Sequence, residues 1–233
     1  NALDMPVARA LLEVATECDS DDGIRCVTMT GAGRMFCAGG DVSAMAAAGD
    51  KVGAMVGDLA STLHLAMSRF ARMNKPLVTL VNGPAAGAGY GMALSGDVVL
   101  CGRAAVFNAA YGMLGVSPDG GLTWLLPRLV GLRKAQEIIL TNRKVTAEEA
   151  EALGMVTRVV DDEALAVAAK LASGAVGAIA RSRALLLNAY DNSWETHLEL
   201  EARGIAGAIA GPEGREGVAA FLGKRKPDFA NAK

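Results

Sequence analysis

The chain has 233 residues, of which 52% are hydrophobic and 21% are charged, and its formal net charge is −2. A chain of this length can bury the core of one large domain or two small ones, as ordinary soluble globular proteins do. The small net charge gives no reason to expect nucleic acid or an anionic membrane surface as a partner. No apolar run approaches the roughly 20 residues of a membrane-spanning helix.

Apolar residues with helical or strand-like spacing predict alternating helices and strands along residues 1–165. The predicted helices cover residues 5–18, 43–48, 56–73, 124–129 and 133–141, with a further short helix that starts at Thr146. The predicted strands cover residues 24–30, 77–81, 98–101, 105–107 and 156–160. Strands that alternate with helices are typical of an α/β domain with largely parallel pairing.

Local signals define several of these elements more closely. Asp4 is the expected N-cap of the first helix, and Thr146 opens a capping box with Glu149. Residues 49–53 are expected to form a mobile loop before the long helix over residues 56–73. The inward face of that long helix is predicted to carry Leu59, Leu63, Met67, Phe70 and Met73.

The composition changes near the end of the predicted α/β region. From Glu163 onward it is helical and rich in alanine, and the last helix is expected over residues 213–222 after Pro212. We therefore predict two parts, a catalytic core over residues 1–165 and a helical region over residues 166–233.

The four cysteines have no spacing typical of a metal site, and we interpret them as reduced, buried thiols. They are Cys18, Cys26, Cys37 and Cys101. Reduced thiols fit the cytosol, and no signal-peptide pattern stands at the start of the sequence. The protein is therefore expected to be cytoplasmic and to hold no metal.

Two glycine-rich segments are candidates for binding a negatively charged atom. Residues 81–91, with the sequence VNGPAAGAGYG, follow the apolar strand, and a helix is expected to begin near Gly87 or Ala88. Residues 36–41, with the sequence FCAGGD, have the same small-residue character. Small side chains let a ligand approach the backbone, and unpaired N–H groups at a helix start stabilise negative charge. Two convergent N–H groups form an oxyanion hole, although two ordinary tight turns have the same composition.

Three motifs together resemble the crotonase, or enoyl-CoA hydratase/isomerase, superfamily. They are residues 36–41 (FCAGGD), 81–89 (VNGPAAGAG) and 118–121 (PDGG), and their order and spacing also match. The resemblance runs over nearly the whole chain. It implies an α/β fold with a crotonase-like ββα spiral core, followed by a C-terminal helical trimerisation region. An acyl-CoA substrate and a homotrimer or dimer of trimers are then expected.

The resemblance also implies roles for single residues. It assigns the two oxyanion donors to the backbone N–H groups of Gly40 and Ala88, which would hold the thioester oxygen as it becomes an enolate. Family hydratases add water with two glutamates, and the matching positions here are Gly91 and Tyr111. Because neither is a carboxylate, hydration by a paired acid and base is not the expected reaction, and a hydratase-type lyase is kept as an alternative.

One carboxylate does stand in the third motif, at Asp119 in the segment SPDGG. This segment resembles the loop of the family's enoyl-CoA isomerases, including the phenylacetate-pathway type, in which an aspartate moves a proton between C2 and C4. We therefore predict a Δ3–Δ2 enoyl-CoA isomerase with Asp119 as the proton shuttle. The alternative role of Asp119 is that of N-cap for the helix that follows it.

His64 raises a different alternative. It lies 24 residues before Ala88, which is the spacing of a catalytic histidine in 4-chlorobenzoyl-CoA dehalogenases. Asp119 also lies eight residues after Tyr111, where those enzymes have a tryptophan and a nucleophilic aspartate. We predict that His64, Gly91 and Tyr111 line the substrate pocket, and we keep dehalogenation and a packed, inactive histidine as alternatives.

Coenzyme A is expected as part of the substrate, so no separate cofactor is implied. By resemblance, its adenine would meet backbone groups of residues 38–42, and a phenylalanine and a lysine near the C-terminus would also bind CoA. These residues are Ala38, Gly39, Asp41, Val42, Phe221 and Lys224. The cationic run at residues 224–226 is equally typical of a solvated chain end.

Two other classes of protein stay open. Gly87, Gly89 and Gly91 after a strand have some likeness to a dinucleotide-binding fingerprint, but the third glycine is one position early and no acidic residue follows for the ribose. A non-catalytic acyl-CoA binder would keep both glycine-rich loops while Asp119 acted only as a helix cap.

Overall fold

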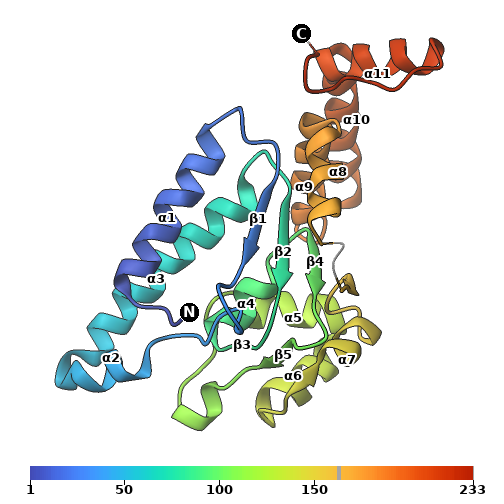
Figure 1. The fold of residues 1–233 in the computed structure, drawn as a ribbon. Coiled ribbons are helices and arrows are strands. Elements are labelled where there is room, and N and C mark those ends of the chain that lie inside the picture. Colours follow the sequence, from blue (N-terminus) through green and yellow to red (C-terminus); the bar gives the residue numbers. More distant parts are fainter. Residues whose placement is uncertain (162–163, 233) are drawn as a thin grey trace.

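The computed structural model describes residues 1–161 and 164–232, and it contains two β-sheets (Figure 1). The larger sheet is parallel throughout, in the order β1 (Val27–Thr30), β2 (Leu77–Val81), β4 (Val98–Cys101) and β7 (Arg158–Val159). The smaller sheet has the order β3 (Ala85–Ala86), β5 (Val106–Asn108) and β6 (Val145–Thr146), with β3 parallel and β6 antiparallel to β5.

Helices surround these sheets. The helices of the first two thirds are α1 (Met5–Ser20), α2 (Val42–Ala47), α3 (Val52–Arg72), α4 (Ala88–Leu94), α5 (Leu122–Val130), α6 (Leu132–Leu140) and α7 (Ala147–Ala152), with 3-10 turns η1 (Gly49–Lys51) and η2 (Tyr111–Leu114). The remaining helices are α8 (Ala164–Ser173), α9 (Val176–Asn188), α10 (Trp194–Ala210) and α11 (Pro212–Leu222). Figure 1 shows α1 and α3 side by side, while α8 to α11 form an arm that extends away from α4 and α5.

The chain order of the elements confirms the expected ββα spiral. β2 lies in the larger sheet, β3 in the smaller one, and α4 follows; β4, β5 and α5 repeat this order. The first turn is abbreviated, because after β1 only Cys37 bridges to Ala85 at the edge of the smaller sheet before α2 and α3. Each repeat of the spiral therefore passes from the larger sheet to the smaller sheet before it enters a helix.

The centre of the core is β2, which helices and neighbouring strands cover on both faces. Leu77, Val78 and Val81 are fully buried, as expected for a continuous β-branched and apolar run in a parallel sheet. Thr79 is the polar member of this strand, and its hydroxyl donates to the Ala93 carbonyl at 2.7 Å. That hydrogen bond offsets the cost of burying the hydroxyl and ties β2 to α4.

Several local predictions are confirmed. The strands over residues 77–81 and 98–101 have the predicted bounds. The Asp4 carboxylate accepts from the Val7 N–H at 2.9 Å, and the Thr146 hydroxyl accepts from the Glu149 N–H at 3.3 Å. On the inward face of α3, four of the five named side chains are buried and Met67 packs against the core while partly exposed.

Other local predictions are wrong. Residues 49–53 do not form a loop, because η1 runs directly into α3 and its N–H groups find helical partners. β3 and β6 were not predicted, since two residues are too few to give a periodic signal. All four cysteines are free, but only Cys37 and Cys101 are buried. Burial raises the pKa of the Cys101 thiol to about 11.

Within the described part of the chain, no single helix has the length and apolar character to cross a membrane. Two helical segments joined at a bend, Leu165–Ser173 and Val176–Asn188, together meet the length and composition of a membrane span, and only those two criteria.

Two arginines attach the C-terminal helices to the core. Arg25 donates to the carbonyls of Ala172 and Gly174, both at 2.7 Å, at the junction of α8 and α9. Arg183 of α9 donates to the carbonyls of Phe70 and Met73 at the C-terminal end of α3. Carbonyls at a helix end lack intrahelical partners, so these bonds satisfy polar groups of both parts of the chain.

Arg183 also makes an ion pair inside the protein. Its Nε lies 2.6 Å from Oδ2 of Asp97, a charge contact whose N–H is not aligned as a hydrogen bond, and its side chain is only 9% exposed. The same Asp97 oxygen accepts from the Leu77 N–H at 2.7 Å, at the start of β2. The arm is therefore tied to the central strand through one carboxylate.

Replacing Arg183 with alanine is expected to lower the free energy of unfolding by about 3 kcal/mol, because it leaves Asp97 and the α3 carbonyls without their buried partner. Chemical denaturation followed by circular dichroism measures this change. The control is Arg203→Ala, which removes an exposed pair with Glu199 on α10 and should cost at most about 0.5 kcal/mol. Equal losses in the two variants would contradict the structural role of Arg183.

Candidate active site

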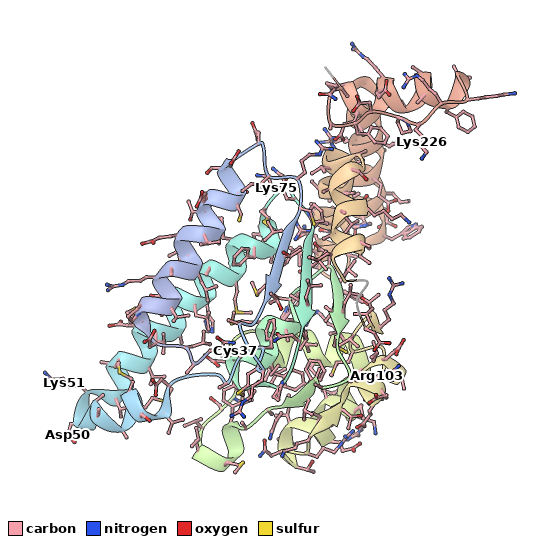
Figure 2. The ribbon with its side chains drawn as sticks, in the orientation of Figure 1. Cys37, Asp50, Lys51, Lys75, Arg103 and Lys226 are labelled. Atoms are coloured by element: carbon pink, nitrogen blue, oxygen red, sulfur yellow. The ribbon has the colours of Figure 1, made fainter. Side chains whose placement is uncertain are left out.

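Two loops meet at the start of α4 through a pair of glycines. Gly39 and Gly87 both have positive φ, at 85° and 54°. A Cβ on Gly39 would lie 2.8 Å from the Ala86 carbonyl oxygen and 3.3 Å from the Gly87 Cα. No side chain fits in this space, so the two backbones are in direct contact. Figure 2 shows Cys37, from the first of these loops, next to α4.

This contact brings two unpaired amides into neighbouring positions. Leu3 bridges to the first loop by donating to the Gly39 carbonyl and accepting from the Asp41 N–H, which turns the Gly40 N–H away from Leu3. Ala88 is the first residue of α4, where an N–H has no intrahelical acceptor. Among the described residues, neither the Gly40 nor the Ala88 N–H donates to a protein acceptor. Both groups are therefore free to donate to a ligand.

A third loop packs on the same helix. A Cβ on Gly91 would lie 2.0 Å from the Gly120 carbonyl oxygen, and a Cβ on Gly120 would lie 3.1 Å from the Ala88 Cα. Gly120 also has a positive φ of 60°. The loop over residues 117–121 thus occupies the space that a side chain at position 91 would need. A glutamate cannot enter at Gly91 while this loop keeps its place.

The third loop holds Asp119 beside Tyr111. The Tyr111 hydroxyl donates to Oδ1 of Asp119 at 2.6 Å, and the Asp119 side chain is 33% exposed. The alternative role as a helix cap is wrong for this side chain. Gly121 is the N-cap of α5 without any side-chain bond, and Asp119 contributes only its backbone carbonyl, to the Leu122 N–H at 3.2 Å.

His64 reaches this loop from α3. Its Nε2 accepts from the Gly120 N–H at 3.1 Å and lies 3.7 Å from Oδ2 of Asp119. An Nε2 that accepts from an amide carries no proton, so the ring is neutral with its hydrogen on Nδ1. The contact between Nε2 of His64 and Oδ2 of Asp119 is therefore not an ion pair, and the 3.7 Å between these atoms is also too long for a hydrogen bond. The His64 side chain holds this loop by accepting a hydrogen bond from the backbone N–H of Gly120.

Tyr111 is held as a hydrogen-bond donor. Burial raises the pKa of its phenol, and the hydrogen bond to Asp119 raises that pKa further, so the hydroxyl keeps its proton. Two asparagines that sequence reasoning missed fix the preceding backbone. Ala110 has a left-handed φ of 63°, and its N–H donates to the side-chain oxygens of Asn108 at 3.0 Å and Asn142 at 2.7 Å. Asn142 is 32 residues away in sequence, so no local pattern could have identified it.

The residues expected to bind CoA fall into two groups that do not meet within one chain. Ala38, Gly39, Asp41 and Val42 lie on or next to the first loop, and the Asp41 side chain is already engaged as the N-cap of α2, where it accepts from Ser43 and Ala44. Phe221 lies in the last turn of α11 and Lys224 two residues after this helix, and Figure 1 shows α11 at the end of the C-terminal arm that lies away from α4.

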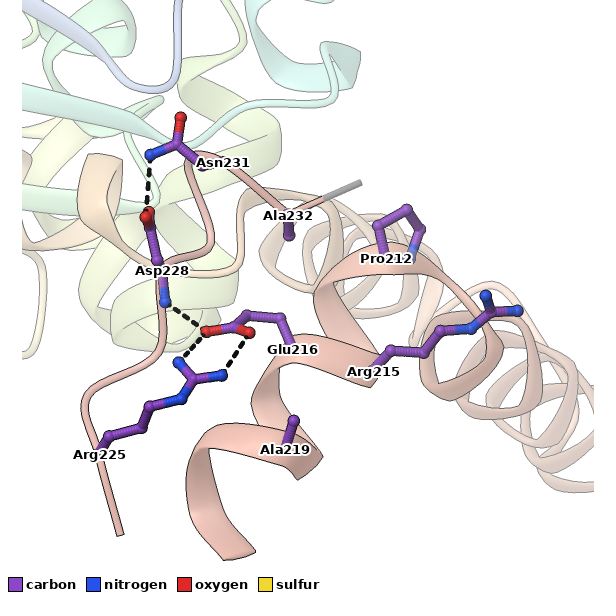
Figure 3. Close-up of a pocket in the computed structure, with 8 residues that line it drawn as sticks. All are labelled: Pro212, Arg215, Glu216, Ala219, Arg225, Asp228, Asn231 and Ala232. Atoms are coloured by element: carbon purple, nitrogen blue, oxygen red, sulfur yellow. Dashed lines mark hydrogen bonds and ion pairs between the residues drawn. The ribbon is translucent and has the colours of Figure 1, made fainter. Parts of the chain in front are cut away.

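A cavity of about 440 Å³ lies in the C-terminal region, between α11 and the residues that follow it (Figure 3). Several of its polar groups bind one another. Glu216 accepts from both terminal nitrogens of Arg225, at 2.6 and 2.8 Å, and from the Asp228 N–H at 2.7 Å. These bonds lower the pKa of Glu216 to about 2. None of the residues from the three loops at α4 lines this cavity.

Residues 1–161 and 164–232 contain no group of histidine, cysteine, aspartate and glutamate side chains arranged to hold a metal ion.

The family model described as enoyl-CoA hydratase/isomerase matches residues 1–232. The chain belongs to this family. Among curated relatives, the 1,2-epoxyphenylacetyl-CoA isomerase of Escherichia coli (strain K12) is 39% identical, over 94% of this chain and 86% of the relative. The 2,3-dehydroadipyl-CoA hydratase of the same organism is 34% identical, over 98% of this chain and 88% of the relative.

Solved structures agree with this family and with the crotonase fold. An enoyl-CoA hydratase/isomerase from Cupriavidus metallidurans CH34 is 32% identical with a TM-score of 0.88, over all of this chain and 89% of the other. An enoyl-CoA hydratase from Bacillus anthracis is 28% identical with a TM-score of 0.91, over 98% of this chain and 90% of the other. These relatives of the enoyl-CoA hydratase/isomerase family carry different activity names, so family membership does not by itself choose the reaction.

Replacing Gly91 with alanine is expected to displace the Asp119 loop, because the new Cβ would overlap the Gly120 carbonyl. Overpacking of this kind costs about 1–3 kcal/mol of stability, which a denaturant titration measures. Gly57→Ala on α3 is the matched control, since its Cβ meets nothing within 4 Å and alanine favours a helix. A Gly91→Ala protein as stable as the wild type would show that the loop is not constrained by this contact.

Proposed function

We propose that this enoyl-CoA hydratase/isomerase family member is a Δ3–Δ2 enoyl-CoA isomerase. The observation that carries the proposal is one carboxylate, Asp119, next to Gly120, which packs on Ala88 and Gly91 of α4, with no second carboxylate at position 91 or 111. A 1,3-proton shift needs one group that both removes and returns a proton. Hydration needs two, so a lone Asp119 favours isomerisation.

In the proposed reaction, the Gly40 and Ala88 N–H groups hold the thioester oxygen of a 3-enoyl-CoA. The Asp119 carboxylate removes a proton from C2, and the electron pair moves onto the thioester oxygen to form a dienolate that the two amides stabilise. The dienolate then takes the same proton from Asp119 at C4. The double bond moves from the 3,4 to the 2,3 position, and the carboxylate is regenerated.

The dehalogenase alternative has less support. A hydrolytic histidine must accept a proton from water, but the Nε2 lone pair of His64 is occupied by the Gly120 N–H.

A second isomerase substrate is favoured by one specific comparison. The relative named 1,2-epoxyphenylacetyl-CoA isomerase is 39% identical over 94% of this chain. A site with an oxyanion hole and one proton-transfer group suits the isomerisation of any CoA thioester with an acidic C2 hydrogen. We therefore propose 1,2-epoxyphenylacetyl-CoA as the alternative substrate.

We also propose that the acyl-CoA site is completed by a second copy of this chain in a cytoplasmic trimer or dimer of trimers. One face of α10 is a stripe of exposed large apolar side chains, formed by Trp194, Leu198, Ile205 and Ile209, which are 43–72% exposed. Such a stripe favours burial against another chain. Phe221, 83% exposed at the end of α11, and Lys224 would then reach the CoA of a neighbouring copy.

The test of the reaction is incubation with a 3-enoyl-CoA while the absorbance of the conjugated 2-enoyl product is followed. Asp119→Asn should lower kcat by about 100-fold or more, because it removes the proton carrier while keeping the shape of the side chain. Parallel reactions with crotonyl-CoA, 4-chlorobenzoyl-CoA and 1,2-epoxyphenylacetyl-CoA separate the alternatives. Full isomerase activity in Asp119→Asn would exclude Asp119 as the shuttle.

The assembly is tested by light scattering after gel filtration. The wild type should have three or six times the 23.9 kDa mass of one chain. Ile205→Glu places a charge in the α10 stripe and should shift the mass toward one chain. Arg203→Glu, on the opposite face of the same helix, is the control and should leave the mass unchanged. A monomeric wild type would contradict the proposed assembly.

A further inference from the structure

The carboxylate of Asp119 is held asymmetrically. Oδ1 accepts the Tyr111 hydroxyl at 2.6 Å, while no described residue donates a hydrogen bond to Oδ2. We propose that Tyr111 is a positioning residue that keeps Oδ1 out of the reaction and leaves Oδ2 as the oxygen that carries the transferred proton. This inference rests on the proposed isomerase function and deepens it.

The contact between Tyr111 and Asp119 is short and rigid. A separation of 2.6 Å is in the range of a charge-assisted O–H···O⁻ bond, which is stronger than a neutral one. The ring of Tyr111 belongs to the hydrophobic core, and the backbone before it is fixed by the two asparagines that hold the Ala110 N–H. The same hydroxyl also lies 3.3 Å from the Asp119 backbone carbonyl, so both of its acceptors belong to Asp119, and the shorter bond to Oδ1 orients the carboxylate.

The neighbours of Oδ2 leave this oxygen free. His64 is the side chain closest to it, and its Nε2 is 3.7 Å away with its lone pair already taken by the Gly120 N–H. The titratable groups that face the pair are therefore His64 from α3 and Cys37 from the first loop, which lies on the side of Tyr111. Neither donates a hydrogen bond to Oδ2, so this oxygen keeps its lone pairs free to take up a proton.

The proton balance of the reaction follows from this geometry. Oδ2 takes the C2 proton and returns it to C4, and the electron pair moves through the dienolate in between. The hydrogen bond from Tyr111 to Oδ1 stays in place throughout. Burial raises the pKa of the Tyr111 phenol, so Tyr111 donates a hydrogen bond without giving up its proton.

The kinetic test compares two tyrosine variants. Tyr111→Phe removes the hydroxyl that holds Asp119, and kcat for a 3-enoyl-CoA should fall by about 10- to 100-fold with KM changed less than about twofold. In D₂O, the product should also contain more deuterium per turnover, because a loosened carboxylate exchanges its proton with solvent more often. Tyr90→Phe is the matched control, since Tyr90 is also buried and donates only to the Met155 sulfur, and both readouts should equal the wild type.

A second measurement does not depend on catalysis. A hydroxyl proton in a short bond to a carboxylate resonates far downfield in the ¹H NMR spectrum of the whole protein. This signal should be present in the wild type and in Tyr90→Phe, and absent in Tyr111→Phe and Asp119→Asn.

The outcomes separate the two proposals. A downfield signal together with unchanged kcat and deuterium content in Tyr111→Phe would overturn the positioning role and leave the isomerase intact. Absence of the signal from the wild type would overturn the hydrogen bond itself. A wild type that shows the signal but isomerises neither candidate substrate would overturn the proposed function, and the proton-transfer role would fall with it.

Discussion

The arrangement of this protein depends on three loop backbones that touch at one short helix. Gly39 meets Gly87, and Gly120 meets both Ala88 and Gly91, at separations that leave no room for a Cβ. Such contacts need residues without side chains, and three of these glycines, Gly39, Gly87 and Gly120, also have positive φ. They pack together the loops that carry Gly40 and Asp119 and the start of α4 at Ala88, which no single loop could do.

The contact between Gly91 and Gly120 also relates the fold to the chemistry. In family hydratases a glutamate stands at the position of Gly91, and here the backbone of the Asp119 loop fills that space. A side chain at position 91 and the Asp119 loop in its present place would overlap. A single Gly91→Glu substitution would therefore not add a second carboxylate unless the Asp119 loop moved.

Hydrogen bonds around Asp119 come from elements that are distant in sequence. His64 of α3 holds the Gly120 N–H, and Tyr111 of η2 holds the carboxylate. Because these bonds fix the loop on two sides, the carboxylate is oriented before substrate binds, and preorganised groups lose little free energy on reaction. A polar network with satisfied partners is also compatible with partial burial.

Much of the molecule was predictable from local pattern. The apolar runs over residues 77–81 and 98–101, the cap at Asp4 and the inward face of α3 all follow from short-range periodicity, and three motifs were enough to suggest the family and its candidate site. Only the tertiary structure decided the two-residue strands of the smaller sheet, the Asn142 contact to Ala110 and the role of Gly91 as a packing surface. These features join segments that lie tens of residues apart. Their physical basis is backbone proximity in space, which residue type and spacing along the chain do not encode.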